Sequence, residues 1–297
     1  MILLSNLYSA LAQGTLWGIM ALGVYITFRI LDIADLSCDG TFALGGCISA
    51  IYITRGVDPF MTLLMALAAG MIAGAVTGIL HTRLMIPAIL SGILTMIALW
   101  SVNIRIMGGP NVSLLGEDTV FTKIMYSLGL DQTFSTVIVG ILIGIIVIAA
   151  LYWFFGTEIG SAVRATGNNE FMVRALGGNT DTAKVLGLVI SNGLISLSGA
   201  LVAQNQGYGD VKMGTGSIVI GLASIVIGEV IFGKRFNFAY ILASLIGGSI
   251  VYRMIISLVL HFGLSTDDMK LFTAIIVAIA LGIPAIKAKY SQRRTPA

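Results

Sequence analysis

Three carboxylates stand close together near the start of the sequence. Asp32, Asp35 and Asp39 follow one another at spacings of three and four, which places them near one face if the interval is helical. Carboxylates gathered in this way could attract a cation. The alternative, which we favour, is structural: Asp39 caps a helix that begins at Gly40, and the other two lie at a membrane interface.

Small and polar side chains recur on one face of a long apolar run. They are spaced by four and three residues: Asn192, Ser196, Gly199, Ala203 and Gln206. Such a stripe cannot favourably face lipid, so it faces either protein or a water-filled path. We predict a translocation pathway that includes Asn192, Ser196 and Gln206, together with Asn103 from an earlier apolar run. A hydrogen bond between helices, without any role in transport, explains Asn192 equally well.

The sequence lacks the constellations that support catalysis or metal binding. It contains no Walker A motif, no paired-histidine zinc motif and no nucleophile motif. Cys38 and Cys47 lie nine residues apart and would point to opposite sides of a helix, so we expect no disulfide between them. We therefore expect no catalytic residue, cofactor or metal, and nothing indicates binding to nucleic acid. Arg253 lies inside an apolar run, where a lone charge is costly, so it either pairs with a carboxylate or extends to the membrane surface.

The composition indicates which elements must position these side chains. The 297 residues are 57% hydrophobic and only 10% charged, whereas soluble domains carry about a quarter charged residues. This composition predicts an all-α polytopic membrane protein that forms a single transmembrane domain over residues 1–297. The first apolar run has no basic segment before it and no clear cleavage site, which favours a retained span over a signal peptide.

Nine apolar runs are candidates for membrane spans, and we expect about eight or nine transmembrane helices. They are approximately Leu7–Phe28, Thr41–Thr54, Phe60–Leu80, Ile86–Met107, Thr133–Phe155, Val185–Ala203, Ser217–Phe232, Phe238–Leu260 and Leu271–Ile286. The second run is short and interrupted by glycine, so it either crosses the membrane or re-enters on the same side.

Glycine recurs at every fourth position of the third run. Gly70, Gly74 and Gly78 would allow another backbone to approach this helix closely. The approaching backbone could belong to a second subunit, which would make the stripe a dimer interface. Packing within one bundle is the interpretation that we favour, because such motifs are common inside bundles.

Positive charges are distributed unevenly between the loops. If residues 157–184 are cytoplasmic, about eleven Lys and Arg residues lie inside and about five outside. This asymmetry predicts an external N-terminus and a cytoplasmic C-terminus. If the second apolar run re-enters, only the N-terminus changes side. The basic tail of residues 287–297 is expected to contact anionic lipid on the inner surface.

The interval of residues 157–184 is polar, yet it is patterned as a short helix. Asn168 and Asn169 can cap the start of a helix, and the pair of glycines that begins at Gly177 favours a left-handed stop. These signals delimit about two helical turns, Glu170–Leu176. We expect residues 157–184 to form a compact cytoplasmic loop around this helix.

The short helix carries apolar side chains on a surface that faces water. A helix of two turns is marginally stable by itself, and Phe171 and Met172 would remain exposed. An exposed apolar patch of this kind favours docking into a partner. The alternatives are that the helix lies on the lipid surface or covers its own bundle.

Three stretches together resemble the permeases of bacterial ABC importers, in the branch that contains the branched-chain amino acid and ribose permeases. They are ADLSCDGTFALGGCISA (Ala34–Ala50), EIGSAVRATGNNEFMVRALGGN (Glu158–Asn179) and LSGALVAQNQGYGDVKMGTGSIVIGLASIVIG (Leu197–Gly228). Within the second stretch, these residues match the motif of the family: Gly160, Arg164, Ala165, Gly167, Asn168, Ala175 and Gly177. The three stretches cover about half of the chain.

The sequence also departs from the common pattern of that branch. Asp32 and Asp39 stand on either side of the D-L-S motif of the first stretch, and Glu229 and Val230 stand where a pair of glycines is usual. These departures resemble a side branch associated with the uptake of aromatic amino acids, tryptophan or tyrosine.

The resemblance implies a fold and a set of partners. The fold would be a permease bundle like that of the type II importers, in a bacterial inner membrane, with residues 157–184 as the cytoplasmic coupling loop. Two ATP-binding subunits would dock inside and a substrate-binding protein outside, and a second permease copy, as in a homodimer, would complete the pathway for a small molecule. These residues would contact the ATPase: Glu158, Gly160, Arg164, Asn168, Glu170, Phe171, Arg174 and Gly177.

We therefore expect a permease that imports a small solute by alternating access. The solute would be an amino acid, in particular an aromatic one, and the chain would not be an enzyme because a partner would hydrolyse ATP. An ABC importer for a sugar or nucleoside is one alternative. A secondary transporter that binds its coupling ion at the carboxylate cluster, without an ATPase, is another, and a membrane scaffold without transport activity is a third.

Overall fold

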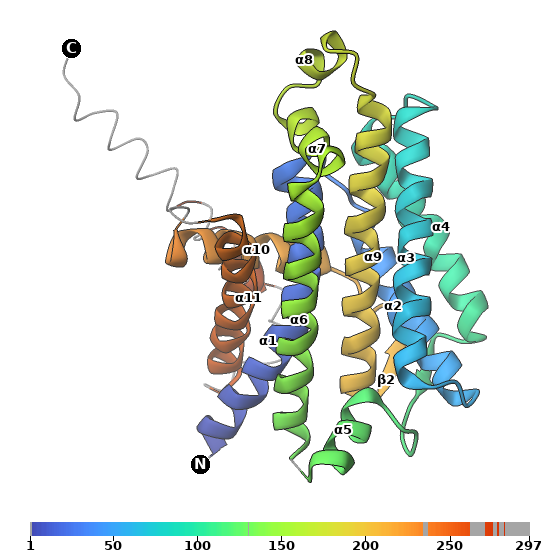
Figure 1. Ribbon diagram of the computed structural model, residues 1–297. Helices are drawn as coiled ribbons and strands as arrows, with labels where there is room; N and C mark the ends of the chain where they lie inside the picture. The colour runs from blue at the N-terminus through green and yellow to red at the C-terminus, as the bar shows by residue number, and fades with distance from the viewer. Residues whose placement is uncertain are drawn as a thin grey trace, which may run out of the picture.

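The computed structural model describes residues 2–129, 131–233, 237–261 and 271–275, together with residues 278 and 282. These residues form a bundle of helices that run mostly along one direction (Figure 1). The predicted run Leu271–Ile286 lies largely outside the described residues, and the predicted tail 287–297 lies wholly outside them.

The elements follow the chain in a simple order. The helices are α1 (Ile2–Tyr25), its π-helical continuation η1 (Ile26–Ile30), α2 (Cys38–Thr54), α3 (Pro59–Thr82), α4 (Ala88–Met107), α5 (Val120–Leu128), α6 (Gln132–Gly156), α7 (Glu158–Asn168), α8 (Glu170–Ala175), α9 (Thr180–Gln206), α10 (Ser217–Phe232) and α11 (Phe238–His261). The strands are β1 (Asn111–Ser113) and β2 (Tyr208–Asp210).

Six of these helices are long and apolar enough to cross a membrane. They are α1 with η1, α3, α4, α6, α9 and α11, while α2 and α10 are apolar but shorter. These eight helices coincide with the first eight predicted runs, so the prediction of an all-α polytopic membrane protein is confirmed. That residues 1–297 form a single domain stays a prediction.

The short helix α2 is surrounded by protein. Nearly every residue from Cys38 to Ala50 is buried, and the helix packs against α9, α3 and α4. A helix inside the bundle does not have to match the thickness of the lipid. Its shortness therefore follows from its central place, and a full crossing of the membrane by α2 stays a prediction.

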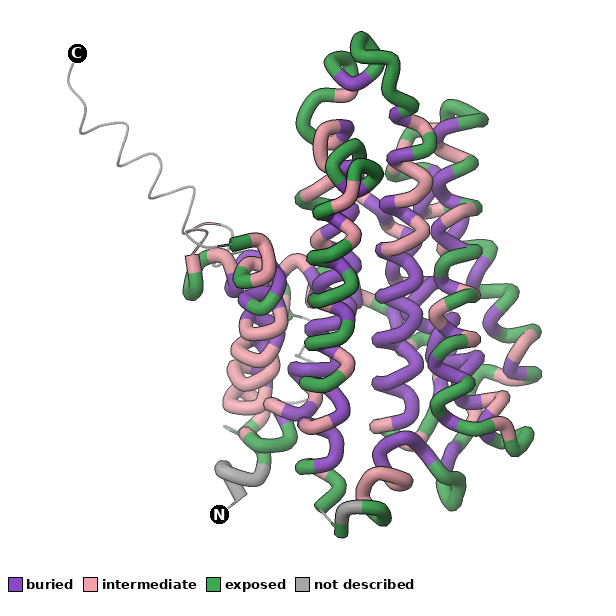
Figure 2. The backbone as a smooth tube through the Cα atoms, viewed as in Figure 1, coloured by how far each residue is buried: buried purple, intermediate pink, exposed green. Residues whose placement is uncertain are grey.

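The helices α3 and α9 pack closely along much of their length. Figure 2 shows buried residues along most of α9. A Cβ atom on Gly70 would lie 2.4 Å from the carbonyl oxygen of Asn192, and one on Gly74 would lie 2.3 Å from that of Leu188. Gly78 meets Val185 in the same way. The glycine stripe thus packs two helices of one chain together, as favoured above, and does not form the dimer interface.

The interval from Asp32 to α2 is not helical, so the three carboxylates do not share a helical face. Asp32 is exposed with φ +55°, Asp35 is buried, and Asp39 lies in the first turn of α2. The described residues contain no group of three His, Cys, Asp or Glu side chains placed to hold a metal. The cation site that the cluster suggested is therefore absent from this part of the chain.

Asp39 caps a helix, but that helix is α10 and not the one predicted to begin at Gly40. Its carboxylate accepts hydrogen bonds from the backbone N–H groups of Gly216 (2.8 Å) and Ile218 (3.1 Å) and from the Ser217 hydroxyl (2.9 Å). These groups form the N-terminus of α10, where free N–H groups and the helix dipole favour a negative charge. The α2 helix itself begins at Cys38, one residue before this carboxylate.

The two ends of the bundle differ. At one end α8 projects beyond the long helices, and α7 lies above the end of α6 (Figure 1). At the other end lie the N-terminus, α5 and a two-stranded antiparallel ribbon, in which Asn111 of β1 faces Asp210 of β2. The segment between α4 and α6 contains β1 and the helix α5, which begins with a capping box between Thr119 and Thr122.

Candidate functional site

The helix α8 begins and ends close to the predicted positions. Asn169 caps it, since its side chain accepts a hydrogen bond from the backbone N–H of Met172 at 3.0 Å. Asn168 is instead the last residue of α7. Gly177 follows the helix with φ +81°, a conformation that costs glycine little. Local signals therefore define this helix, as expected for a segment with so few tertiary contacts.

Ionic contacts fix α8 onto the start of α9. Glu170 accepts a hydrogen bond from Lys184 of α9 at 2.8 Å and pairs with Arg174 one turn along α8 at 2.6 Å. The Arg174 guanidinium also donates to the Thr180 hydroxyl at 2.8 Å and lies 3.5 Å from Asp181. Glu170 and Arg174 were both predicted to contact an ATPase. In the structure they join α8 to the start of α9 in the same chain.

The hydrogen bond from Lys184 has an electrostatic consequence for Glu170. This bond lowers the pKa of the Glu170 carboxyl below its usual 4.5, with further contributions from the positive charges of Lys184 and Arg174. Partial burial acts in the opposite direction. The carboxylate is consequently ionised at neutral pH, and the contact between α8 and α9 is complete there.

The opposite face of α8 is apolar and open. Phe171 is 83% exposed and Leu176 is 79% exposed, and Met172 beside them is half-exposed. Val173 alone turns toward the bundle and is buried. An apolar surface that projects beyond the bundle in this way is suited to a groove on another protein.

The other predicted contact residues divide into exposed and structural ones. Glu158 and Asn168 are exposed at the two ends of α7. Gly160 is buried, and a Cβ atom there would lie 2.2 Å from the Phe154 carbonyl oxygen. Its lack of a side chain therefore allows α7 to turn back against α6.

Arg164 was predicted to face a partner, and the structure directs it inward. Its guanidinium lies 3.9 Å from the ring centroid of Phe238 and 5.1 Å from that of Phe155. Burial lowers the pKa of Arg164 below its ordinary value, but a guanidinium remains charged at neutral pH. The residue therefore links α7 to α6 and α11 through cation–π contacts.

The predicted pathway residues Asn192 and Ser196 lie in the bundle interior. Asn192 is fully buried and donates to Asp35 at 2.8 Å, and Ser37 lies within 3.1 Å of its amide oxygen. The Ser196 hydroxyl donates to the Ala66 carbonyl oxygen at 2.6 Å. These contacts match the alternative of a hydrogen bond between helices, and the role of both residues in transport stays a prediction.

Of the two glutamines near the end of α9, the one that was not predicted lies in the interior, and a role of Gln206 in transport stays a prediction. Gln206 is exposed at the end of α9, whereas Gln204 is buried. Gln204 donates to Ser49 of α2 at 2.9 Å and accepts from the backbone N–H of Val120 at 3.0 Å. It thus joins three elements, and only its type, a second amide two residues from Gln206, could have indicated it.

Asn103, from α4, lines a cavity of about 410 Å³ between α4, the start of α2 and the segment after β2. Asp39, Trp100 and Thr215 line the same cavity. Among the predicted pathway residues, Asn103 is the one that the structure places beside a cavity of this kind.

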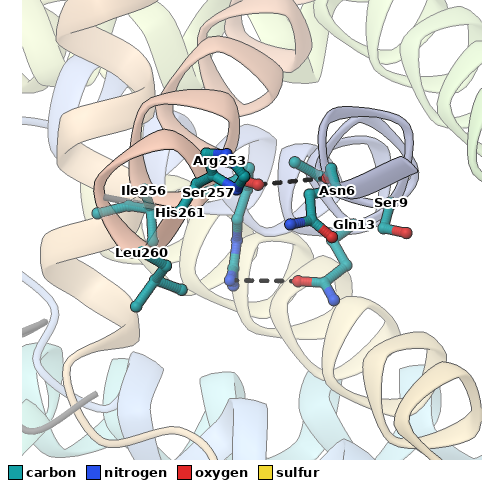
Figure 3. Close-up of a pocket in the computed structure, with 9 residues that line it drawn as sticks. Asn6, Ser9, Gln13, Arg253, Ile256, Ser257, Leu260 and His261 are labelled. Atoms are coloured by element: carbon teal, nitrogen blue, oxygen red, sulfur yellow. Dashed lines mark hydrogen bonds between the residues drawn. The ribbon is translucent and has the colours of Figure 1, made fainter. Parts of the chain in front are cut away.

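A second cavity, of about 540 Å³, lies between α1 and α11 (Figure 3). Arg253 reaches into it and donates to the side chain of Gln13 at 3.4 Å, and its guanidinium lies 4.2 Å from the ring centroid of Trp17. No carboxylate lies within 4 Å of it among the described residues. The predicted carboxylate partner is therefore replaced here by an amide and an aromatic face.

Comparison with known proteins identifies the family to which the chain is similar. Residues 6–283 match the family described as branched-chain amino acid transport system / permease component. A tyrosine transport system permease protein of Clostridioides difficile is 40% identical over 274 residues, which cover 92% of this chain and 90% of that protein. No solved structure matches the chain significantly.

Two further relatives extend the range of similarity. An uncharacterized protein of Rickettsia prowazekii is 34% identical over 278 residues, 93% of this chain and 96% of that protein. The ribose import permease protein of Escherichia coli is 27% identical over 201 residues, 67% of this chain and 61% of that protein. The chain belongs to the permease family of branched-chain amino acid transport systems. It is a multi-pass membrane permease, a transport component.

Proposed function

We propose that this permease is the membrane subunit of an ATP-driven ABC importer, in which α8 is the coupling helix. The observation that carries the proposal is the two-sided character of α8. One face is fixed to α9 through Glu170 and Lys184, and the other exposes Phe171 and Leu176. Force applied to the exposed face would reach α9 through these ionic contacts.

The proposal includes the partners of this permease. Two cytoplasmic ATPase subunits dock at the end that carries α8, so in this proposal residues 157–184 are cytoplasmic and the N-terminus, which lies at the opposite end of the bundle (Figure 1), is outside. A substrate-binding protein docks at the end formed by α5 and the β-ribbon. A second copy of this chain completes a pathway that alternates between two openings. The contacts to the ATPase come from Phe171, with Glu158, Asn168 and Gly177 around it.

The transported molecule is an amino acid, and in particular an aromatic one. The support is the name of the Clostridioides difficile relative, a tyrosine transport system permease protein, which is similar along nearly the whole chain. A sugar is the second candidate, since the more distant Escherichia coli relative is a ribose import permease protein. Ion coupling has less support, because the three carboxylates lie apart and two of them are engaged as hydrogen-bond acceptors.

The test is to replace Phe171 by Asp, with Met85→Asp as a matched control. Met85 is 81% exposed and lies in the turn between α3 and α4 at the same end of the bundle. Uptake of labelled tyrosine into cells should fall roughly tenfold or more in Phe171→Asp, because a lost apolar anchor costs an interface about 2 kcal/mol or more. The control should transport normally.

The same cells allow a direct test of the partner. A tagged chain purified in mild detergent should bring along an ATPase identifiable by mass spectrometry, and Phe171→Asp should lose it while Met85→Asp retains it. Full uptake by Phe171→Asp, or uptake that persists without ATP and follows an ion gradient, would show that α8 is not a coupling helix.

A further inference from the structure

The cavity beside Asn103 has a distinctive set of polar groups. It is bounded by α4, by the first turn of α2 and by the segment that follows β2. Among the described residues that line it, Asp39 carries the only ionisable side chain. These residues therefore offer one negative charge and no positive charge to a ligand.

Asn103 contributes an amide oxygen that lacks a hydrogen bond. The residue is only 1% exposed, and its amide nitrogen donates to the Gly40 carbonyl oxygen at 3.2 Å. Since a carbonyl can only accept, this contact fixes which end of the amide is the oxygen. The Asn103 Oδ1 atom is buried and has no partner in the structure. A buried acceptor in this state is costly until a donor reaches it.

Asp39 adds further acceptor capacity on the wall of the same cavity. Three donors from the start of α10 occupy its carboxylate and hold it in place. A carboxylate offers about four lone-pair positions, so one remains for a ligand. Two acceptors and a net negative charge favour a cationic group with several N–H donors, which describes an ammonium ion.

The remaining wall is largely apolar. Met96 and Trp100 of α4 line it, and Trp100 is exposed on the outer face of the helix. An aromatic or aliphatic side chain would pack there, and a tryptophan face also attracts cations. The hydroxyl groups of Ser101 and Thr215, which line the same cavity, can donate to a carboxylate.

We propose that this cavity is a subsite for the transported molecule, which binds the ammonium group and the apolar side chain of a zwitterionic amino acid. The inference rests on the proposed importer function and adds the recognition chemistry within the membrane subunit. Selection here acts on the ammonium group through Asn103 and Asp39. A sugar carries no such cation and would offer these acceptors only neutral hydroxyl donors, which form weaker hydrogen bonds to a carboxylate than an ammonium group does.

Binding can be measured on the full chain alone, in lipid nanodiscs, by saturation-transfer NMR of small probes. Tyramine carries an aromatic ring and an ammonium group, whereas 3-(4-hydroxyphenyl)propionate carries the same ring and a carboxylate. Tyramine should show saturation transfer above that in empty nanodiscs, and L-tyrosine should displace it. The propionate should not displace it, and equal displacement by the propionate would overturn the proposal.

Variants locate the site. Asn103→Leu should weaken tyramine binding roughly tenfold or more, the usual effect of losing a hydrogen bond to a charged group. Asn111→Leu removes an exposed amide outside the cavity and should bind as the unmodified chain does. Trp100→Ala alters only an exposed part of the wall, so it should weaken binding without affecting folding even if Asn103→Leu folds poorly. Unchanged affinity in both cavity variants would place the ligand elsewhere.

This measurement is independent of the importer test. Binding needs neither an ATPase nor a binding protein, so loss of uptake in Phe171→Asp has no effect on it. ATP-dependent tyrosine uptake combined with no tyramine binding would refute the subsite and leave the importer function intact. Tyramine binding combined with ATP-independent uptake would support the subsite and refute the ATP-driven importer.

Discussion

The helix α9 takes part in two contacts of opposite kinds. Along its length, α3 approaches it backbone to backbone at Gly70 and Gly74, with no room for a single added carbon. At its start, long ionic side chains, led by Glu170 and Lys184, join α8 to it. The first contact makes α3 and α9 one rigid unit, because atoms in close contact cannot adjust to a shift. The second is made by side chains on one face of α8 and leaves the apolar face of α8 free for a partner.

The strongest way to break the rigid contact is to add a side chain at Gly74. Gly74→Val would bring carbon atoms against the Leu188 carbonyl oxygen, which already lies 2.3 Å from the position of a Cβ. We expect a loss of about 3 kcal/mol in the free energy of unfolding, measured by thermal unfolding in detergent. Gly109→Val is the control, since nothing lies within 4 Å of a Cβ there. Equal stability of the two variants would contradict the close contact.

A smaller effect is expected from the polar contact within the same interior. Asn192→Leu removes the donor that lies 2.8 Å from the Asp35 carboxylate and leaves that buried acceptor short of a partner. The expected loss is about 2 kcal/mol in the free energy of unfolding. Gln206→Leu removes an exposed amide of the same helix and should change stability by less than about 0.5 kcal/mol. A stable Asn192→Leu variant would mean that this network does not hold α9 in place.

The substitution Glu170→Gln tests the ionic contact between α8 and α9. This change removes the charge that Lys184 and Arg174 share and should cost about 0.5–1 kcal/mol, because the pair is partly exposed to water. Amide hydrogen exchange should accelerate in residues 169–178 and remain unchanged in the core of α3 and α9. If exchange accelerates in both regions, the two contacts are not separate.

The smallest expected effect is that of acid on the contact between α8 and α9. Since the folded structure lowers the pKa of Glu170, its ionic contacts stabilise α8 fully above about pH 4.5, the ordinary value, and weaken as the pH falls through the lowered folded value. The methyl signal of Met172 in an isotope-labelled chain should be constant between neutral pH and that point and shift below it. Glu170→Gln should show no such transition, and an identical shift in that variant would assign it to another group.

Sequence reasoning succeeded where the signals lie within a few residues. The ends of α8 follow from a capping side chain at Asn169 and a left-handed glycine at Gly177, both adjacent to the helix. The membrane spans follow from apolar runs of sufficient length. The exposed Phe171 was likewise expected, because a two-turn helix in a polar loop has too little surface to bury its own apolar side chains.

Reasoning from the sequence failed where a side chain's partner is distant along the chain. Asp39 caps α10 rather than its own helix, from 177 positions away at Gly216. Arg164 stacks on Phe238 of α11 instead of facing a partner protein. Gln204 rather than Gln206 joins the interior network, because two positions along a helix turn a side chain through about 200°.

The sequence by itself therefore determined the class of protein, the number and order of the described apolar helices, and the short helix that projects from the bundle. These depend on composition and on local hydrogen bonds, which a few neighbouring residues supply. The tertiary structure alone decided which polar groups meet inside the bundle and that the Asn103 amide oxygen is left without a partner beside a cavity. That depends on the rotation of each helix about its axis, which the packing of all its neighbours fixes together.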